Sequence, residues 1–423
     1  MSPSIRRTVH LILPNPGYPG WWVVAACLLC AALSAPGQSY ALGLYMEPIA
    51  RALGSSRVEV ATVYAWATLA AAAVLPLAGR LADRTRSRTY LPGVVALLGA
   101  ALVLLASVAS WPLLAAAFFC LRLLGQGATG LGVMTTVLRW FQEHRGRAVA
   151  IAMLGYAVGE FAMPSIIVAL QGALGWRGSL IALASAYLLA FAPLVFLVVR
   201  AAPAPSNSPA ARRAALAPVE ITAAAAIKMP RFWLLAALVS VTPFVLTGLL
   251  LNHVALFDHV GWTAMNVAQA LQAYAVASLL ATYTVGSLLD KLPGRFGILL
   301  SMGLLGLALL VPLGVRSVPV GILLYGGLLG AAAGSNTACN GVIWPEYFGV
   351  GSVGAIKGVV STLRNAATAA AAPLGAWLVS TENGFSTTLM AGAGLAGVAA
   401  CGGLFFLPGP PEEAGATPAR SIG

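Results

Sequence analysis

Charged residues are scarce in this sequence of 423 residues: only 9% are Asp, Glu, Lys or Arg, whereas 59% are hydrophobic. A water-soluble domain carries about a quarter charged residues, so the composition excludes an ordinary soluble enzyme, a DNA-binding protein or a disordered chain. Apolar stretches follow one another along the chain, and each is long enough to cross a bilayer. The sequence therefore predicts a multi-pass membrane protein that contacts lipid and binds no nucleic acid.

Cysteine and histidine are also few. The five cysteines all lie inside apolar runs, where cysteine behaves as a small buried residue. No pair of them has the spacing of an extracellular disulfide framework or of a zinc site. The four histidines lie at the edges of apolar segments. We therefore expect no metal and no other cofactor, and the absence of a catalytic cluster argues against an enzyme.

Twelve apolar segments predict twelve transmembrane helices and thus an all-α membrane protein. The first segment also has the length of a signal peptide, but its apolar run continues past the small residues Leu33-Ser34-Ala35. The expected spans are 21–45, 58–80, 90–109, 112–137, 148–171, 178–199, 232–256, 265–288, 296–314, 318–341, 354–379 and 385–407.

The basic residues set the expected orientation. With the N-terminus inside, 18 of the 24 Lys and Arg residues fall on the cytoplasmic side and 4 on the opposite side. This bias predicts that both termini of the chain are cytoplasmic in the cell membrane. The expected organisation is an N-terminal tail at 1–20, a six-helix bundle at 21–199, a cytoplasmic linker at 200–230, a second bundle at 231–407 and a tail at 408–423.

The two halves of the chain are related by an internal repeat. They match at a constant offset of 207 residues, in the pairs Gly79–Gly286, Leu81–Leu288, Asp83–Asp290, Arg84–Lys291 and Arg88–Arg295. The acidic pair is informative because only twelve acidic residues exist in the chain. Two parallel six-helix repeats that rock about a central site are an architecture of transporters, so we predict two pseudo-symmetric bundles.

The loop from Gly79 to Arg88 resembles the signature loop of the major facilitator superfamily, and 286–291 resembles its weaker second copy. Arg122 with the glycines that follow it is similar to the motif of the fourth span in that superfamily. The resemblance covers essentially the whole chain and implies a twelve-helix secondary transporter that works by alternating access. Glu160 stands where the antiporter motif of span five has proline, which disfavours a drug/proton antiporter.

Three shorter matches concern a branch of the superfamily. The opening of the first helix, 20–24, is similar to that of monocarboxylate porters and oxalate–formate antiporters. The loops at 140–148 and 347–358 resemble the same branch. Oxalate–formate antiporters carry basic residues in spans eight and eleven. Arg364 fits the second of these, whereas span eight has only Gln269 and Gln272, so a monocarboxylate is favoured over a dianion.

Asp83 lies where span two reaches the cytoplasm. A carboxylate there can face Arg84, Arg88, Arg145 or Arg147, or the positive end of a neighbouring helix. Such contacts would break as the halves rock, which makes a state-dependent latch. The alternative is an ordinary topology signal that keeps the loop in water. We interpret the following residues as a cytoplasmic gate: Gly79, Asp83, Arg84, Arg88, Asp290 and Lys291.

Three formal charges lie deep inside predicted spans: Arg122, Glu160 and Arg364. Each costs ~2.5–3.5 kcal/mol at the centre of a helix, so each needs a partner, a water-filled cavity or a function. Arg122 and Glu160 lie ~22 Å and ~18 Å from the cytoplasmic ends of their spans, near the midplane, and an ion pair between them is plausible. Glu160 is then either the proton-coupling group or a fixed structural partner of Arg122.

Polar side chains recur at helical spacing on several spans, and such stripes should face the interior of the bundle because lipid cannot satisfy them. We interpret them together with the two arginines as substrate-binding residues: Arg364, Arg122, Asn365, Gln126, Gln38, Tyr156, Gln272, Asn336 and Asn340. For the uncharged members the alternative is a hydrogen bond between packed helices, worth ~0.6 kcal/mol.

Two arginines and one carboxylate leave an excess positive charge at the midplane, which favours a small anion. We therefore predict a secondary transporter, expected to be a monomer, that moves a small, monocarboxylate-like organic anion in symport with protons or in exchange for another anion. One alternative is an exporter of a hydrophobic or cationic compound, for which Glu160 would be the main contact. A membrane-embedded sensor or enzyme is an alternative of another class.

Overall fold

The computed structural model describes residues 18–141, 145–199, 223–289, 291–315, 317–348 and 353–405. Within these ranges every regular element is a helix, so the predicted all-α fold is confirmed. The elements of the first half are α2 (Gly20–Ala32), η1 (Ala35–Gly37), α3 (Ser39–Gly43), α4 (Met46–Leu53), α5 (Arg57–Arg84), α6 (Ser87–Ala106), α7 (Trp111–Leu121), η2 (Arg122–Ala128), α8 (Thr129–Trp140), α9 (Arg145–Ser185), η3 (Ala186–Phe191) and α10 (Ala192–Val198).

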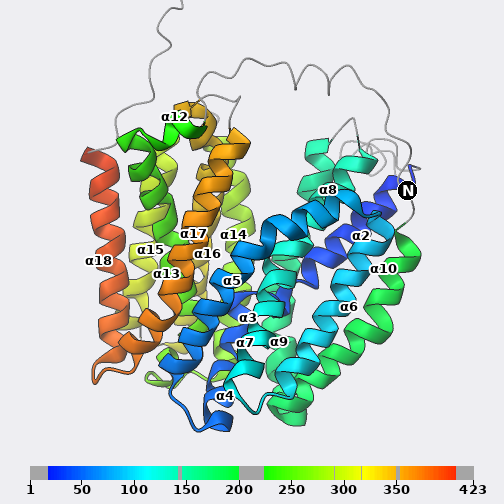
Figure 1. Cartoon of the computed structure of the whole chain (residues 1–423). Coiled ribbons are helices and arrows are strands. Elements are labelled where there is room, and N and C mark those ends of the chain that lie inside the picture. The colour runs from blue at the N-terminus through cyan, green and yellow to red at the C-terminus, as the bar shows by residue number, and fades with distance from the viewer. Residues whose placement is uncertain are drawn as a thin grey trace, which may run out of the picture.

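The second half contributes α12 (Ala223–Ile227), α13 (Pro230–Asp258), α14 (Ala264–Leu289), α15 (Arg295–Gly314), α16 (Val318–Phe348), α17 (Val353–Val379) and α18 (Gly384–Phe405). Residues 200–222, which form most of the expected linker, lie outside the described residues. Figure 1 shows the helices in two groups, one formed by α2 to α10 and the other by α12 to α18.

Ten helices in the described part of the chain are long and apolar enough to cross a membrane. One of them, Arg147–Val198, has 52 residues, a length of ~78 Å that suffices for two crossings. Gly175 divides it, because its φ of 70° interrupts the helix between the two spans that the sequence predicts. Counted as two spans, this helix brings the number of spans to eleven. α17, whose charged residues lower its hydropathy, is the twelfth.

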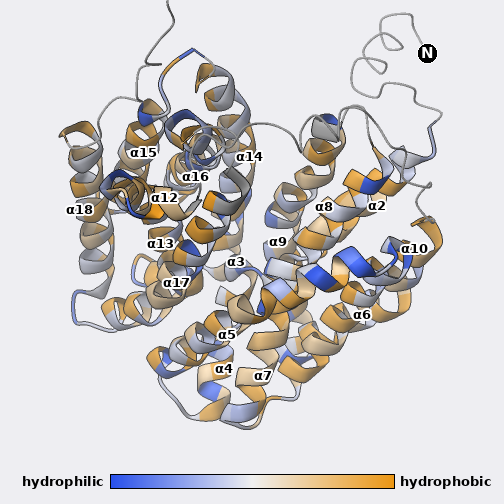
Figure 2. Cartoon of the chain, turned by 45° about the horizontal axis from the view of Figure 1, so that its top comes forward, coloured by the Kyte–Doolittle hydropathy of each residue, from blue (hydrophilic) through white to orange (hydrophobic). Residues whose placement is uncertain are grey.

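The two groups pack on each other mainly through α5 with α17, α9 with α14, and α3 with α13, and α4 also contacts α13. In Figures 1 and 2 the groups diverge toward the end of the molecule where α12 lies, and they approach each other at the end where α4 lies. We refer to these as the α12 end and the α4 end. Hydrophobic residues cover most helix surfaces in Figure 2, as lipid contact requires.

Small residues allow close packing of α14 on α16. Gly326, Gly330 and Gly334 recur every four residues on one face of α16. A Cβ atom at any of them would collide with a backbone carbonyl oxygen of α14. Such close approach of backbones is typical of helix contacts in membranes, where lipid is as apolar as the side chains.

The first span is not the continuous helix 21–45 that the sequence predicts. It is divided into α2, η1 and α3, and Pro36 lies at the break. Proline lacks the N–H that a continuing helix would use, so neighbouring backbone groups are left for other partners. Gly37 packs directly on Gly125 of η2, where a Cβ on either residue would collide with the other backbone. The break also places the carbonyl group of Gly37 within hydrogen-bond distance of Arg122.

Candidate functional site

A cavity of ≈ 280 Å³ lies between the two groups of helices. It joins α5 and η2 of the first half to α17 of the second half, and acidic residues are absent from the described residues that line it. Its polar lining consists of Thr68, Arg122, Gln126, Ser361, Arg364 and Asn365. Four of the nine predicted substrate-binding residues therefore meet here. We call this space the shared cavity.

Arg122 is held firmly at the wall of the shared cavity. Its side chain is almost fully enclosed, with 3% of the residue exposed. Nη1 donates to the carbonyl oxygen of Gly37 at 2.8 Å, and Nε donates to the Thr68 hydroxyl at 3.2 Å. The guanidinium also lies over the ring of Tyr64, 5.0 Å from its centroid. These contacts fix the orientation of the positive charge before any ligand arrives.

The helix around Arg122 is a π-helix, η2, which extends from Arg122 to Ala128. Such segments inside α-helices are frequent at functional sites. The wider turn lies beside the contact of Gly125 with Gly37, which brings the broken first span close to Arg122. The local distortions of both spans therefore cooperate in orienting one guanidinium.

Arg364 differs from Arg122 because its guanidinium forms neither a hydrogen bond nor an ion pair with the residues that the structure describes. It lines the shared cavity and also a second cavity of ≈ 180 Å³ between α16 and α17. The polar side chains around the second cavity are those of Thr337, Asn340, Lys357, Ser361 and Arg364. Arg364 thus lies at the junction of two polar spaces with its donors available.

The expected ion pair between Arg122 and Glu160 is not formed. Among the described residues the ion pairs join Glu47 to Arg51 and Glu47 to Arg57. Arg122 uses its donors on Gly37 and Thr68 instead, because the break in the first span presents a free carbonyl group to it. The prediction of this pair was therefore wrong, and Glu160 is not the structural partner of Arg122.

Glu160 lies on α9 near the contact of the two halves. Its charge acts on the buried hydroxyl groups of Tyr40 on α3 and Tyr274 on α14. The carboxyl group therefore shares a neighbourhood with phenols from both halves rather than with an arginine. Nearby on the same pair of helices, Gln272 Nε2 of α14 donates to Ser165 Oγ of α9 at 3.0 Å.

Several predicted residues lie at contacts between helices. Gln38 donates to the carbonyl oxygen of Gly125 at 3.4 Å, and the buried Asn336 donates to that of Val239 at 3.1 Å. The hydroxyl of Tyr156 lies beside Gly130, 2.8 Å from where a Cβ of that residue would be. Asn336 is therefore engaged in helix packing, away from both cavities, which is the alternative that the sequence left open.

Asn340 is placed differently from Asn336, although both lie on α16. Its Oδ1 accepts a hydrogen bond from Trp344 Nε1 at 2.6 Å. The side chain lines the second cavity together with Lys357 and Arg364. Its amide NH2 group is thus the part that remains for a ligand.

The predicted gate residues lie at the α12 end. Asp83, Arg84 and Lys291 are exposed there, and Asp290 lies outside the described residues. Gly79 lies on α5 one turn before Asp83. The carboxylate of Asp83 forms no ion pair with a side chain that the structure describes. Because the Arg145 side chain and Asp290 lie outside the described residues, the latch stays a prediction.

Arg88 and Arg139 have definite partners near this gate. The Arg88 guanidinium lies over the ring of Phe196, 4.7 Å from its centroid. Arg139 of α8 donates to the last carbonyl groups of α5, at 2.7 Å to Thr85 and 2.5 Å to Asp83. Sequence reasoning missed Arg139 as a contact residue. Its place at the end of span four, next to the signature loop, was the available signal.

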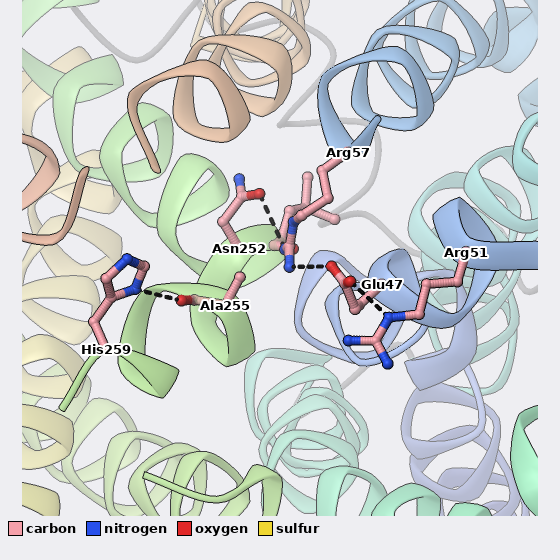
Figure 3. Close-up of polar contacts among 7 residues, drawn as sticks. Glu47, Arg51, Arg57, Asn252, Ala255 and His259 are labelled. Carbon is pink, nitrogen blue, oxygen red and sulfur yellow. Dashed lines mark hydrogen bonds and ion pairs between the residues drawn. The ribbon is translucent and has the colours of Figure 1, made fainter. Parts of the chain in front are cut away.

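At the α4 end the halves are joined by Arg57, the first residue of α5 (Figure 3). Its Nη1 contacts the Glu47 carboxylate at 3.1 Å, and its Nη2 donates to Asn252 Oδ1 of α13 at 3.2 Å. Nη2 also lies 3.5 Å from the carbonyl oxygen of Leu251. The sequence analysis did not single out this contact, which closes the α4 end.

The helical fold, the cavity between two halves and the polar groups inside it define a membrane transporter with a central site. The sequence profile of the Major Facilitator Superfamily matches residues 27–311 and 254–422. The chain belongs to this superfamily of secondary transporters, which work by alternating access. No curated protein matches the sequence.

Solved structures share the fold. A bacterial homologue of the human lysosomal transporter Spinster, in an inward-facing and unoccupied conformation, matches with a TM-score of 0.70 and 16% identity over 92% of this chain and 96% of that chain. Its occupied inward-facing form matches with the same TM-score and identity over 92% and 97%. A mutant of the nucleoside transporter NupG matches with a TM-score of 0.69 and 14% identity over 90% and 98%.

Proposed function

We propose that this transporter moves a small, monocarboxylate-like organic anion. The observation that carries the proposal is that Arg364, which has no hydrogen bond or ion pair with the described residues, lines the same cavity as the fixed Arg122. No carboxylate is among the described residues that line this cavity. Guanidinium groups bind carboxylates in a bidentate fashion and are weakly hydrated, so they suit a site that must accept and release an anion. Gln126 of η2 and Asn365 of α17 supply further polar groups, one from each half, to the same cavity.

The position of the shared cavity supports a role in alternating access. An anion held between Arg122 and Arg364 would contact both halves at once. A ligand shifts a conformational equilibrium only through a difference in its affinity for the two states. Because the contacts exist only when the two walls are close, substrate binding at this place would draw the halves together at the α12 end.

Glu160 is the proposed proton carrier. It lies among the phenols of Tyr40 and Tyr274 at the contact of α9 with α14, so its protonation would alter a contact between the halves. Symport with a proton and exchange for a second anion are both compatible with this site. The monocarboxylate porter and oxalate–formate branch remains part of the proposal, with the α12 end as the cytoplasmic side of the cell membrane and the exposed loop residues as its gate.

The decisive test is uptake of lactate, pyruvate, formate and oxalate into proteoliposomes under a pH gradient. Arg364→Gln is expected to reduce uptake of every accepted acid at least about tenfold, because one charge-assisted hydrogen bond contributes ~1.5–3 kcal/mol. Arg51→Gln is the matched control, since it removes a surface arginine whose side chain is 78% exposed and far from the cavity. Normal anion uptake by Arg364→Gln would reject the anion site and favour an exporter of cationic compounds.

Glu160→Gln tests the coupling separately. The amide has nearly the same shape but cannot release a proton. We expect it to abolish accumulation of the anion against its gradient while exchange of labelled for unlabelled anion continues. Accumulation at the wild-type level would remove Glu160 from the mechanism and leave anion exchange as the mode of transport.

A further inference from the structure

The second cavity has a polar, positively charged lining to which the proposed substrate site in the shared cavity assigns no role. The residues that line its ≈ 180 Å³ all come from α16 and α17, so it belongs to the second half. Two of its lining residues, Lys357 and Arg364, are positively charged, and the described residues that line it include no acidic one. A polar cavity with two cations and no carboxylate has a strongly positive potential, because low-dielectric walls focus the field of like charges.

The spacing of the two cations places them on one face of α17. They are seven residues apart, which is nearly two full helical turns and a rise of about 10 Å. Lys357 lies toward the α12 end and Arg364 lies deeper, at the boundary with the shared cavity. The cations therefore form a path that leads from the open end of the molecule to the proposed substrate site.

The donors of this cavity are largely unused. Lys357 Nζ has a single acceptor, the carbonyl oxygen of Gly341 at 3.5 Å, although an ammonium group has three donors. The carbonyl oxygen of the Asn340 side chain is occupied by Trp344, which leaves the amide NH2 group of Asn340 as a donor. Arg364 makes no hydrogen bond with the described residues. Each of these three groups can therefore still donate to a ligand that enters the cavity.

We propose that this cavity is a second anion-binding site, in which the carboxylate of the transported acid lies between Lys357 and Arg364 before it enters the shared cavity. The inference rests on the proposed function, because it assigns the first contact of the same substrate. Arg364 borders both spaces, so it can keep one oxygen of the carboxylate while the other is transferred from Lys357 to the donors around Arg122.

The two sites respond differently to the movement of the halves. The shared cavity is lined by both halves, so it changes when α5 and η2 move relative to α17. The second cavity is lined by α16 and α17 of one half, and each half of such a transporter rocks largely as a rigid body. The second site therefore keeps its geometry through the cycle and serves to collect anions. Such a site lowers the KM for the anion without altering the maximal rate, and its effect decreases with ionic strength because Lys357 is partly exposed.

Lactate uptake from the α12 end in proteoliposomes of uniform orientation tests this site, with pyruvate and formate in parallel. Lys357→Gln is expected to raise the KM about tenfold, an effect of ~1.4 kcal/mol, with an unchanged maximal rate and a flatter salt dependence. Lys357→Arg should keep the wild-type KM. Lys228→Gln is the matched control, because it removes an exposed lysine at the same end that lines neither cavity.

A chemical rescue strengthens the test. Lys357→Cys should show the raised KM, and an aminoethyl thiosulfonate reagent, which restores a positive charge, should bring it back. A sulfonate reagent, which adds a negative charge, should raise the KM of this variant further. Wild-type protein is treated in parallel because Cys401 is exposed.

The outcomes separate the two proposals. Loss of uptake in Arg364→Gln together with a wild-type KM and salt dependence in Lys357→Gln overturns the second site and leaves the proposed function intact. Unchanged uptake of each acid in Arg364→Gln, or no uptake of any acid by the wild type, overturns both.

Discussion

The two halves of the molecule each present an arginine to the shared cavity, and the two side chains are held in different ways. Arg122 belongs to a π-helix and donates to Gly37 and Thr68, with 3% of its surface exposed. Arg364 belongs to a regular helix and keeps its donors free among the described residues. The protein itself fixes the first guanidinium, whereas the donors of the second remain for a ligand in the proposed site.

The repeat shows a second contrast at the α12 end. Arg139 and Glu346 stand at equivalent places of the two halves, at the same offset of 207 residues. Arg139 donates to the backbone carbonyl groups of Thr85 and Asp83, whereas Glu346 accepts from the backbone N–H of Gly294 at 2.9 Å. Each side chain fixes the loop that follows the second helix of its half. The anchoring side chain thus stands at the same place in both halves but has the opposite charge. Arg139 suits the first loop because carbonyl groups point toward it, and Glu346 suits the second because an N–H group does.

The largest expected effect distinguishes the two arginines. In the proposed anion site each arginine forms charge-assisted hydrogen bonds with the substrate, so Arg122→Gln and Arg364→Gln should both reduce anion uptake at least about tenfold. Arg122→Gln should also lower the melting temperature of the purified protein by several degrees, because the Gly37 carbonyl and the Thr68 hydroxyl lose a buried donor. Arg364→Gln should leave the melting temperature unchanged. Equal losses of stability would show that the contrast between a fixed and a free guanidinium is wrong.

A second comparison concerns packing at Gly334 and Gly127, which are equivalent in the repeat. A Cβ at Gly334 would collide with the backbone carbonyl of Ser278, whereas at Gly127 it would collide with the flexible side chain of Leu75. Gly334→Ala should therefore destabilise the protein by ~1–3 kcal/mol, the usual cost of overpacking, and Gly127→Ala by clearly less. Thermal unfolding followed by tryptophan fluorescence measures both. A larger loss for Gly127→Ala would contradict the packing argument.

The loop anchors should give a smaller effect. Arg139→Gln loses charged hydrogen bonds to the end of α5 and should destabilise the protein by about 1 kcal/mol. Glu346→Gln should have less effect, because the amide oxygen can still accept from Gly294 N–H. Limited proteolysis of the two loops, together with melting temperatures, compares the variants. Similar losses from both would mean that the charge of the anchor, and not its hydrogen-bonding role, is what matters.

The smallest expected effect is at the α4 end. Asn252→Ala removes the hydrogen bond from Arg57 to the second half, and Asn252→Asp replaces it with an ion pair. Asn252 is buried, but its hydrogen bond with Arg57 is long at 3.2 Å. We therefore expect the lower part of the usual net contribution of a hydrogen bond, ~0.5–1 kcal/mol, so the fraction of molecules open at this end should rise or fall by a factor of up to about five. Spin labels at Arg51→Cys and His259→Cys, both exposed, report the distance across this end. A shift in the same direction for both variants would argue against a gate here.

Several features of the fold and the site followed from the sequence. The spans, the two halves and the family could be predicted, because apolar runs and the loop from Gly79 to Arg88 are local signals. The meeting of Arg122, Gln126, Arg364 and Asn365 was anticipated in kind, since isolated polar groups inside spans must avoid lipid. The division of the first span at Pro36 was missed. Its proline was visible, but several predicted spans contain proline without a break.

The partner of each polar group could not be derived from the sequence. Depth along the helices predicted an ion pair between Arg122 and Glu160. In the structure Arg122 instead donates to a backbone carbonyl group and a hydroxyl group, and Glu160 lies near the phenols of Tyr40 and Tyr274. Depth along a helix fixes only one coordinate of a side chain. Rotation of the helix and irregular turns such as η2 fix the others, and these depend on how neighbouring backbones pack.

The sequence by itself determined that this chain spans a membrane many times, that it is built from two related halves and that three charges lie within its spans. Long apolar runs and a repeated motif are local patterns, and a charge inside an apolar run is costly and therefore rare. Only the tertiary structure decided which arginine is bound to the protein and which is free, where Glu160 lies, and that Lys357 shares a cavity with Arg364. These assignments depend on contacts between helices distant in the chain, and such contacts are set by packing rather than by local composition.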